Sequence, residues 1–251
     1  QELDDGGYLI CGTSYDGGTN NDFDAMLWTL TQDGATAASI YNESDEASHD
    51  YGRYAEQTMD GGYIMVTTSI TIASSARDAE VIKLVAAGTL DVTFNAAGTV
   101  PGIVPISNSD EGRFIQERGE DGYIVVGNSE VGTGQQSDAY INTIARNGTE
   151  GGTPVTMGGA YSDKVACVKQ TSDGGYVFTG SKYNQSSQTD VWVVKLTPSL
   201  TVDWDYTFGG NNADNGSSIA QTTDGGYIIT GSTRSYGDQQ SEIILLKLDA
   251  S

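Results

Sequence analysis

The chain has 251 residues, of which 37% are hydrophobic and 33 are glycine, a composition that favours many short strands and tight turns over a helical core. Its 34 acidic and 12 basic residues give a formal net charge of −22, so the surface repels nucleic acid and anionic membranes. The sequence contains no long apolar run that could span a bilayer, and we expect no membrane insertion.

A short motif built on Asp-Gly-Gly-Tyr occurs five times along the chain. The last copy, QTTDGGYIITGST, covers Gln221–Thr233, and successive motif tyrosines lie 55, 60, 53 and 51 residues apart. Self-similarity with a period of about 50 residues predicts a propeller or another repeat array. We expect a structural role in the repeat for the turn aspartates and the tyrosines behind them, namely Asp5, Asp60, Asp121, Asp173, Asp224, Tyr8, Tyr63, Tyr123, Tyr176 and Tyr227.

Each repeat predicts four short antiparallel strands. In the fourth copy these are Val165–Gln170, Tyr176–Ser181, Val191–Leu196 and Val202–Phe208. We expect a type I′ turn at Asp-Gly, because both residues tolerate positive φ. A glycine four residues after the tyrosine, such as Gly180, indicates a bulge or a close backbone approach. The sequence therefore predicts an all-β fold, a five-bladed β-propeller of four-stranded antiparallel blades.

The expected domain is a single propeller over residues 1–251, with repeats at about 1–54, 55–114, 115–167, 168–218 and 219–251. The first repeat has almost no residues before its turn, and the fifth has only three residues after its third strand. Both terminal blades should therefore lack one strand. An open strand edge invites pairing. We expect either that these residues belong to a longer protein or that a neighbouring chain completes the open blade, as in a filament or surface lattice.

A second position is shared by all five repeats, six residues before the end of the third strand. It is always acidic, and its members are Asp24, Asp78, Asp138, Asp190 and Glu242. We interpret these acids as structural, because aspartate at a strand start bonds nearby backbone amides, and the alternative is a ring of carboxylates around an ion.

Calcium is the one cofactor that the sequence suggests. Two oxygen-rich loops could supply hard ligands, with Asn20, Asp22 and Asp24 in one and Asn212 and Asp214 in the other. Asparagine and aspartate are also common turn residues, so a purely structural reading competes with the metal site.

The sequence gives little support for catalysis, and we expect no catalytic residue. The single histidine, His49, is expected in a solvated loop, and Cys11 and Cys167 are expected to be unpaired buried thiols. Glycoside hydrolases use two carboxylates that flank the sugar, but no pair stands out among the 34 acids.

Five tyrosines fall in or beside the long, variable connections between strands. Exposed loops on a rigid scaffold are the usual place for binding, and a tyrosine offers a ring for stacking and a hydroxyl for hydrogen bonding. The candidate ligand-binding residues are Tyr15, Tyr51, Tyr161, Tyr183 and Tyr236.

The combined pattern QTxDGGYIITGxT…DxxLLKLD…WxxTFGG resembles the repeat of secreted bacterial and archaeal β-propeller proteins of the cell surface. The run GTLDVTFNAAGTV at 88–100 resembles a related propeller repeat. The resemblance implies an extracellular or cell-surface location and says almost nothing about activity. Our leading hypothesis is a non-enzymatic structural or adhesive surface module. A glycan-binding, lectin-like propeller is the first alternative and a hydrolase-like enzyme the second. The expected partners are other proteins or copies of the chain itself at the open terminal blades, or glycans.

Overall fold

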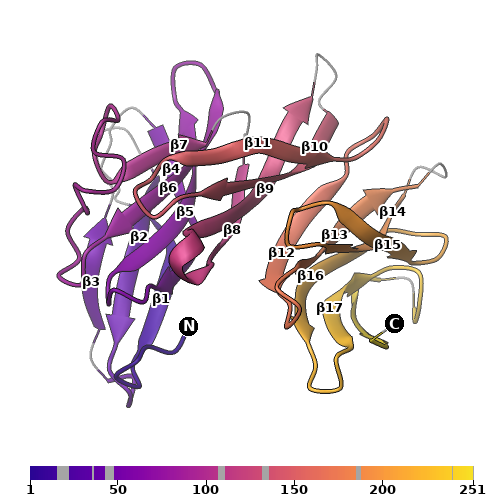
Figure 1. Ribbon diagram of the computed structural model, residues 1–251. Coiled ribbons are helices and arrows are strands. Elements are labelled where there is room, and N and C mark those ends of the chain that lie inside the picture. Colours follow the sequence, from indigo (N-terminus) through magenta and orange to yellow (C-terminus); the bar gives the residue numbers. More distant parts are fainter. Residues whose placement is uncertain are drawn as a thin grey trace. The chain divides into compact units, whose positions relative to one another are not determined.

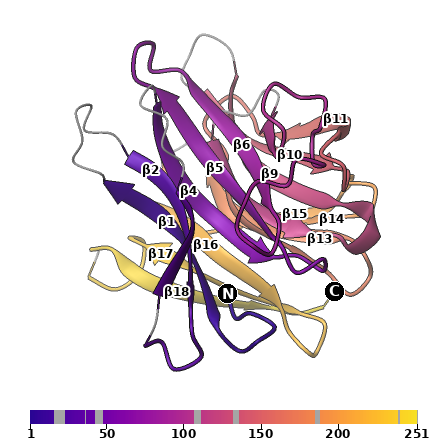
Figure 2. The same cartoon turned by 90° about the vertical axis from the view of Figure 1, so that its left-hand side faces the viewer.

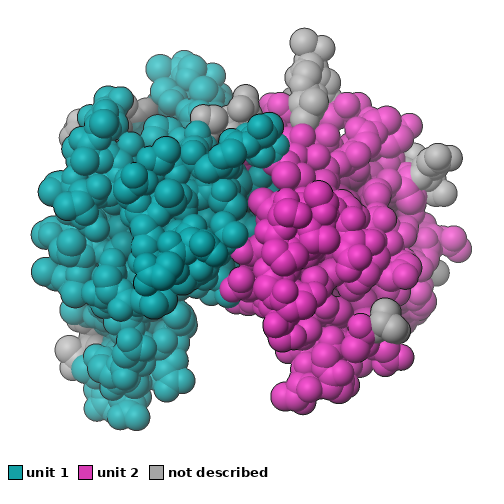
Figure 3. Space-filling view, viewed as in Figure 1, with its two compact units in different colours: residues 1–127, 141–154 teal, residues 128–140, 155–251 magenta. Residues whose placement is uncertain are grey.

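The computed structural model describes residues 1–15, 23–35, 37–42, 48–106, 111–131, 136–184, 188–238 and 240–250 (Figure 1). In these ranges the chain is all β apart from a short 3₁₀ helix, η1 (Gly119–Asp121). It divides into two compact units (Figure 3), unit 1 with residues 1–127 and 141–154 and unit 2 with residues 128–140 and 155–251. No helix in the described ranges is long enough to cross a membrane.

The strands form five antiparallel sheets, which we number in chain order. Sheet 1 contains β1 (Tyr8–Tyr15), β2 (Phe23–Leu30) and β3 (Ala37–Asn42), and sheet 2 contains β4 (Ser48–Gln57), β5 (Tyr63–Thr71), β6 (Arg77–Leu84) and β7 (Ile103–Ile106). Sheet 3 contains β8 (Glu111–Glu117), β9 (Tyr123–Val131), β10 (Gln136–Ile144) and β11 (Glu150–Met157). Sheet 4 contains β12 (Lys164–Gln170), β13 (Tyr176–Tyr183), β14 (Thr189–Leu196) and β15 (Val202–Phe208), and sheet 5 contains β16 (Asp214–Gln221), β17 (Tyr227–Thr233) and β18 (Glu242–Leu248).

Five sheets, one for each repeat, confirm the predicted all-β repeat fold. Only sheets 2, 3 and 4 have the four strands that we expected of every blade, whereas sheets 1 and 5 have three. In sheet 1 the first two residues begin a fourth strand, because Glu2 bridges Tyr8 and the Gln1 carbonyl accepts the Leu9 N–H at 2.7 Å. Sheet 5 ends at β18.

The Asp-Gly-Gly turns are not the type I′ turns that we predicted. In the second copy, Thr58 and Gly62 close a three-residue loop, with Thr58 N donating to Gly62 O at 3.0 Å and Gly61 N to Thr58 O at 2.8 Å. Only Gly61 has a positive φ, +76°, and Asp60 does not. The Asp60 carboxylate accepts the Thr58 hydroxyl at 2.6 Å and the Gly62 N–H at 2.9 Å. These side-chain bonds favour a three-residue loop with one left-handed glycine.

The second glycine of each turn is required by a close approach to the end of the third strand. A Cβ added there would lie under 3.0 Å from a carbonyl oxygen, a distance that real Cβ atoms essentially never show. The five pairs of glycine and carbonyl are Gly7 with Leu30, Gly62 with Leu84, Gly122 with Ile144, Gly175 with Leu196, and Gly226 with Leu248.

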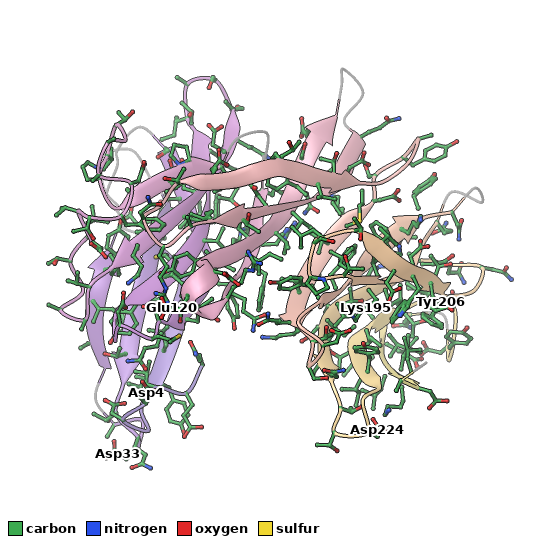
Figure 4. All side chains as sticks on the ribbon, viewed as in Figure 1. Asp4, Asp33, Glu120, Lys195, Tyr206 and Asp224 are labelled. Carbon is green, nitrogen blue, oxygen red and sulfur yellow. The ribbon has the colours of Figure 1, made fainter. Side chains whose placement is uncertain are left out.

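A lysine from the third strand joins the turn aspartate in three of the five repeats. The Lys83 side chain is buried, and its Nζ lies 3.0 Å from Asp60 Oδ2 and donates to the Leu84 carbonyl at 3.1 Å. Lys195 with Asp173 and Lys247 with Asp224 repeat this contact at 2.8 and 2.9 Å, with Asp224 at the turn tip labelled in Figure 4.

The two other turn aspartates differ. Asp5 accepts the Gly7 N–H at 2.9 Å, but residue 29 of the third strand is threonine rather than lysine. Asp121 lies in η1, where a 3₁₀ turn replaces the side-chain-capped loop. The shared structural role that we expected of the five aspartates is therefore complete at Asp60, Asp173 and Asp224, partial at Asp5 and missing at Asp121.

Four of the five motif tyrosines are buried in the core, and Tyr8 is 43% exposed. Tyr123 packs edge-on against Phe94 at 6.0 Å between ring centroids, and Tyr227 packs against Trp204 at 5.7 Å. Phe94 and Trp204 belong to the repeats that precede these tyrosines. In the third and fifth repeats the motif tyrosine therefore packs against an aromatic ring of the preceding repeat.

Neighbouring sheets within a unit meet backbone to backbone. The first strand of a sheet lies against the middle strands of the preceding sheet, as β4 does against β1 and β2 in unit 1 (Figure 2). A Cβ on Gly52 of β4 would overlap the Gly12 carbonyl of β1. A Cβ on Gly112 of β8 would lie on the Thr67 carbonyl of β5, and one on Gly216 of β16 on the Thr179 hydroxyl of β13. No side chain fits at these crossings.

The strand glycines allow a matched stability test. Gly231 of β17 faces the β-bulge at Gly216/Ser218, and a Cβ there would overlap the Asn215 carbonyl. Gly12 holds the same repeat position in β1, yet its Cβ would meet nothing within 4 Å. We expect Gly231→Ala to destabilise the protein by about 1–3 kcal/mol in urea unfolding, because the backbone must move. Gly12→Ala should be neutral or slightly stabilising. Equal losses for the two variants would contradict this account.

The lysine–aspartate contact predicts how stability depends on pH. Burial raises the pKa of Asp60, but the Thr58 and Gly62 hydrogen bonds and Lys83 outweigh it and lower the pKa to about 2. A lowered folded pKa gives stability that is complete above the unfolded value, 3.8, and is lost as the pH falls towards 2. In urea unfolding between pH 2 and pH 6, Asp60→Asn should flatten this loss. The same change at Asp5, whose turn has no lysine, should flatten it less, and equal effects would refute the role of Lys83.

Candidate functional site

Two of the predicted ligand-binding tyrosines form a ring pair in unit 2. Tyr183 ends β13 and Tyr161 precedes β12, and their ring centroids lie 4.6 Å apart with 30° between the planes. Tyr161 is 49% exposed. The Tyr183 N–H donates to the buried Asp163 carboxylate at 2.8 Å. This bond fixes the backbone of Tyr183 at the end of β13.

A second carboxyl group, that of Asp138 at the start of β10, lies next to Asp163. Burial and the nearby Asp163 charge raise the pKa of Asp138, and a hydrogen bond from the Gly159 N–H opposes them. Asp138 Oδ1 is buried without a hydrogen-bond partner among the described atoms and lies against Gly158. Asp163 N donates to the Ser137 carbonyl at 2.7 Å, which ties the two carboxylate-bearing segments together.

Tyr183 also lines a polar pocket of about 520 Å³, which lies between the end of β13, the start of β14 and β15. Tyr206 of β15, labelled in Figure 4, is a second ring on its wall and is 54% exposed. The complete lining is Lys182, Tyr183, Asn184, Asp190, Asp205, Tyr206 and Thr207.

The charges in this pocket are held by defined contacts. Lys182 Nζ lies 3.1 Å from Asp205 Oδ2 and 4.8 Å from the centre of the Trp192 ring, and Trp192 Nε1 donates to Asp205 at 3.3 Å. Burial raises the pKa of Asp205, but the bonds from Lys182 and Trp192 outweigh it, so the group stays ionised. Asn184 Nδ2 donates to Asp190 Oδ2 at 3.1 Å. The pocket thus combines two aromatic rings with carboxylate and ammonium groups.

A second aromatic cluster lies in unit 1 around Phe23, the first residue of β2. Its ring centroid is 5.3 Å from Tyr15, 5.4 Å from His49 and 5.6 Å from Tyr51, and the Tyr51 ring is stacked on it. Phe23 N donates to His49 Nδ1 at 3.3 Å. Our placement of His49 in a solvated loop is wrong, because His49 and Tyr51 both lie within β4. Sequence reasoning missed Phe23, the residue that joins the two predicted tyrosines.

Tyr236, the fifth predicted tyrosine, joins neither cluster. Its hydroxyl donates to the Gly209 carbonyl at 3.1 Å, and its side chain is 54% exposed. The five candidates therefore divide into the pair Tyr161 and Tyr183, the pair Tyr15 and Tyr51 bridged by Phe23, and a single tyrosine.

The structure describes three of the five predicted calcium ligands, namely Asp24, Asn212 and Asp214. Asn20 and Asp22 lie outside the described residues, and Asp24 is buried. Asp214 is fully buried, and its oxygens accept the Gly210 N–H and the hydroxyls of Thr233 and Ser235. Asn212 Nδ2 donates to the Arg234 carbonyl at 3.1 Å. A cation here would have to displace these donors, and the described residues contain no group of three or more His, Cys, Asp or Glu side chains placed to bind a metal.

The third-strand acids pack against glycines. A Cβ on Gly158 would overlap the Asp138 carboxylate, and one on Gly209 would overlap the Asp190 carboxylate. Gly237 stands in the same relation to Glu242, which accepts the Asp238 N–H at 2.9 Å. In the third and fourth repeats the glycine after the fourth strand leaves room for the acid, and in the fifth a glycine in the connection before β18 does so. This packing supports the structural interpretation of these three acids.

Three buried acids share a position at the start of the first strand. Sequence reasoning did not identify this repeated position, although it named Asp214 as a calcium ligand. Asp50, Asp163 and Asp214 are each at most 2% exposed and stand two residues before Gly52, Val165 and Gly216. Their fixed distance from the motif was a usable signal. Asp50 also lines a pocket of about 370 Å³ in unit 1 together with Glu80.

No protein-family model and no curated protein sequence matches this chain. Solved structures do match. The chain aligns over its full length with 86% of a candidate exo-β-1,3-galactanase from Bifidobacterium bifidum s17, at 13% identity and a TM-score of 0.54. It aligns over 96% of its length with 54% of a GH43 β-1,3-galactosidase, at 8% identity and a TM-score of 0.50. An endo-arabinase from Bacteroides thetaiotaomicron VPI-5482 matches at 12% identity over 99% of this chain and 94% of that one, with a TM-score of 0.46.

The five antiparallel sheets and the structural matches together define the class of fold. The chain is all β, with five sheets of three or four strands, and it matches five-bladed β-propeller folds. Its fold resembles that of GH43-type glycosidases, and at 8–13% identity this likeness concerns the fold alone.

The Asp138–Asp163 pair predicts a measurable titration shift. Because burial and the Asp163 charge raise the pKa of Asp138, NMR titration of its side-chain carboxyl carbon should give a value above 3.8. Asp163→Asn keeps an acceptor for the Tyr183 N–H but removes the charge, so the Asp138 pKa should fall. Asp50→Asn in unit 1 is the control and should not move it. An Asp138 pKa that is unchanged by Asp163→Asn would show that the two groups are not coupled.

Proposed function

We propose that this protein is a non-enzymatic, extracellular glycan-binding module, with its sugar site in the Tyr183–Tyr206 pocket of unit 2. The proposal keeps the surface-module hypothesis drawn from the sequence and adopts its glycan-binding alternative as the way the module adheres. The observation that carries it is the combination of two aromatic rings with anchored carboxylate and ammonium groups in one pocket.

This combination suits the chemistry of a sugar. A pyranose ring presents apolar C–H faces, which pack on aromatic rings, and a rim of hydroxyls, which donate to carboxylates and accept from ammonium and amide groups. A volume of about 520 Å³ lies in the range of small-molecule sites. The Tyr161 ring, stacked on Tyr183, would extend the aromatic surface beyond the pocket towards a second sugar unit.

The net charge of −22 bears on which glycans would bind. Acidic polysaccharides would be repelled by the surface as a whole, and Lys182 is already paired with Asp205. We therefore expect neutral glycans rather than sulfated or uronic acid polymers.

The test is binding of purified protein to a glycan array, followed by calorimetric titration with the best neutral oligosaccharide. Tyr183→Ala should weaken binding at least roughly tenfold, about 1.4 kcal/mol, because it removes the ring shared by the pocket and the tyrosine pair. Tyr15→Ala, in the unit 1 cluster, is the matched control and should leave the affinity unchanged. Loss of binding in Tyr15→Ala alone would move the site to unit 1, and no binding to any neutral glycan would overturn the proposal.

A hydrolase is the second candidate, favoured by the raised pKa of Asp138 beside Asp163. A carboxyl group with a raised pKa beside a second carboxyl group is an arrangement that general acid–base pairs use. Incubation of the bound oligosaccharide with the protein distinguishes the two candidates. A binding module leaves the sugar intact, whereas a hydrolase releases products and loses that activity in Asp138→Asn.

A further inference from the structure

The pocket of about 370 Å³ that Asp50 and Glu80 line lies entirely in unit 1. Its lining comes from the four strands of sheet 2 and from the connection that leads into β7. Asp50 is 1% exposed and Val100 is 47% exposed, so the carboxylate lies at the closed end of the pocket and the connection lies at its mouth. None of the lining residues belongs to unit 2 or to the ends of the chain.

Glu80 departs from the repeat pattern. It stands two residues after Asp78, the third-strand acid of the second repeat. In the four other repeats the same position holds a large apolar residue, namely Met26, Tyr140, Trp192 or Ile244, and the last three of these are buried. A half-buried glutamate at this position gives up apolar packing that the other repeats keep.

The residue opposite Glu80 departs from the pattern as well. Thr67 of β5 lies opposite Glu80, whereas in sheet 4 Gly180 lies opposite Trp192. Directly opposed residues of an antiparallel pair have their side chains on the same face of the sheet. The Thr67 side chain is fully buried, and its hydroxyl has no hydrogen-bond partner among the described atoms. Because a buried hydroxyl without a partner is costly, this hydroxyl indicates a polar occupant on the face that carries Glu80.

The lining combines negative charge with hydroxyl groups. Its charged residues are Asp50 and Glu80, and no lysine or arginine is among the described residues that border the pocket. Its hydroxyls come from Ser48, Ser69 and Thr99. The Ser48 hydroxyl donates to Asp50 Oδ2 at 2.8 Å, which orients the carboxylate without neutralising its charge. A cationic ligand with N–H donors suits such a lining, because its charge and its donors are both matched.

The rest of the wall is apolar and consists of Val100, Ile103 and Pro105. An alkylammonium ion lays its methylene stem along apolar surface and keeps its charged head among polar groups. The volume of about 370 Å³ lies near the lower limit of small-molecule sites. In the part of the chain that the structure describes, no three His, Cys, Asp or Glu side chains are grouped to hold a metal. The wall therefore favours an organic cation over a bare metal ion.

We propose that this pocket binds a small aliphatic amine in its ammonium form. The ammonium group lies at Asp50 and Glu80, and the alkyl chain lies against Ile103 and Pro105. The net charge of −22 supports the binding, because it raises the concentration of cations near the surface. This pocket is separate from the proposed sugar site in unit 2, so either proposal can fail without the other.

The probe is butylamine, titrated by calorimetry into the 251-residue protein at pH 7 and low ionic strength. An alkylamine is protonated at this pH. We expect saturable binding of one amine per chain, and added sodium chloride should weaken it because salt screens the charges. Butan-1-ol, which has the same chain without the charge, should bind at least roughly tenfold more weakly.

Glu80→Gln removes one charge with little change of shape and should weaken butylamine binding at least roughly tenfold. Glu120→Gln is the matched control, because it is the same substitution in unit 1 on η1, where the side chain is 90% exposed (Figure 4). It should leave the affinity unchanged. Ser69→Ala is a second variant of the lining, with an expected loss of about threefold, and it keeps the test open if Glu80→Gln does not fold.

Absence of saturable butylamine binding at low ionic strength would overturn the proposal, as would equal affinity in Glu80→Gln and Glu120→Gln. Equal affinity for butan-1-ol would show an apolar cavity and would refute the ammonium site. Calcium binding that Glu80→Gln abolishes, without butylamine binding, would identify a metal site instead. Tyr183→Ala, which tests the sugar site, should leave butylamine binding unchanged.

Discussion

The close backbone contact between neighbouring sheets within a unit is the constraint on which the rest of the structure depends. Sheets packed face to face are usually separated by a side-chain layer of about 10 Å. That layer is missing where Gly52 lies on the Gly12 carbonyl and where Gly112 lies on the Thr67 carbonyl. The first strand pairs irregularly with the second strand at these contacts. The register shifts lie at Gly52/Tyr54 and Gly216/Ser218. Glycine at these positions is therefore set by packing, not by turn chemistry.

The lysine–aspartate contact joins the end of the third strand to the Asp-Gly-Gly turn. The second turn glycine brings the turn against the last carbonyl of the third strand, and Lys83 and Lys195 reach that same carbonyl from inside the sheet. A nearly buried ammonium is costly unless its donors are used. Here one donor goes to the carbonyl and another to an aspartate that is still half exposed, so the charge is compensated without burying both ions. The lysine is absent from the first and third repeats. The first keeps the loop capped by Asp5, whereas η1 replaces that loop in the third.

The sequence predicted the sheets better than it predicted the candidate functional sites. The strand positions followed from the repeat, because five copies of one turn motif fix where each hairpin begins. The turn type did not follow, since the general preference of Asp-Gly for type I′ takes no account of a threonine two residues earlier that bonds the Asp60 carboxylate. The candidate ligand-binding tyrosines were chosen because they lie near predicted loops. A position near a loop does not predict which aromatic rings will be in contact. Phe23 and Asp205 acquire their roles only when separate strands come together, and no local pattern marks them.

The fourth and fifth repeats satisfy the same buried aspartate position in two different ways. In both repeats a buried aspartate before the first strand holds the end of the second strand. In the fifth repeat the Asp214 carboxylate accepts hydrogen bonds from the hydroxyls of Thr233 and Ser235 and from the Gly210 N–H. Those two side chains are therefore already engaged within the protein. In the fourth repeat Asp163 is bonded by the backbone N–H of Tyr183. Because a main-chain donor takes the structural role there, the Tyr183 ring can stack on Tyr161 and line the pocket. A departure from the repeat pattern at this position thus leaves the Tyr183 ring available to line the pocket that we propose as the sugar site.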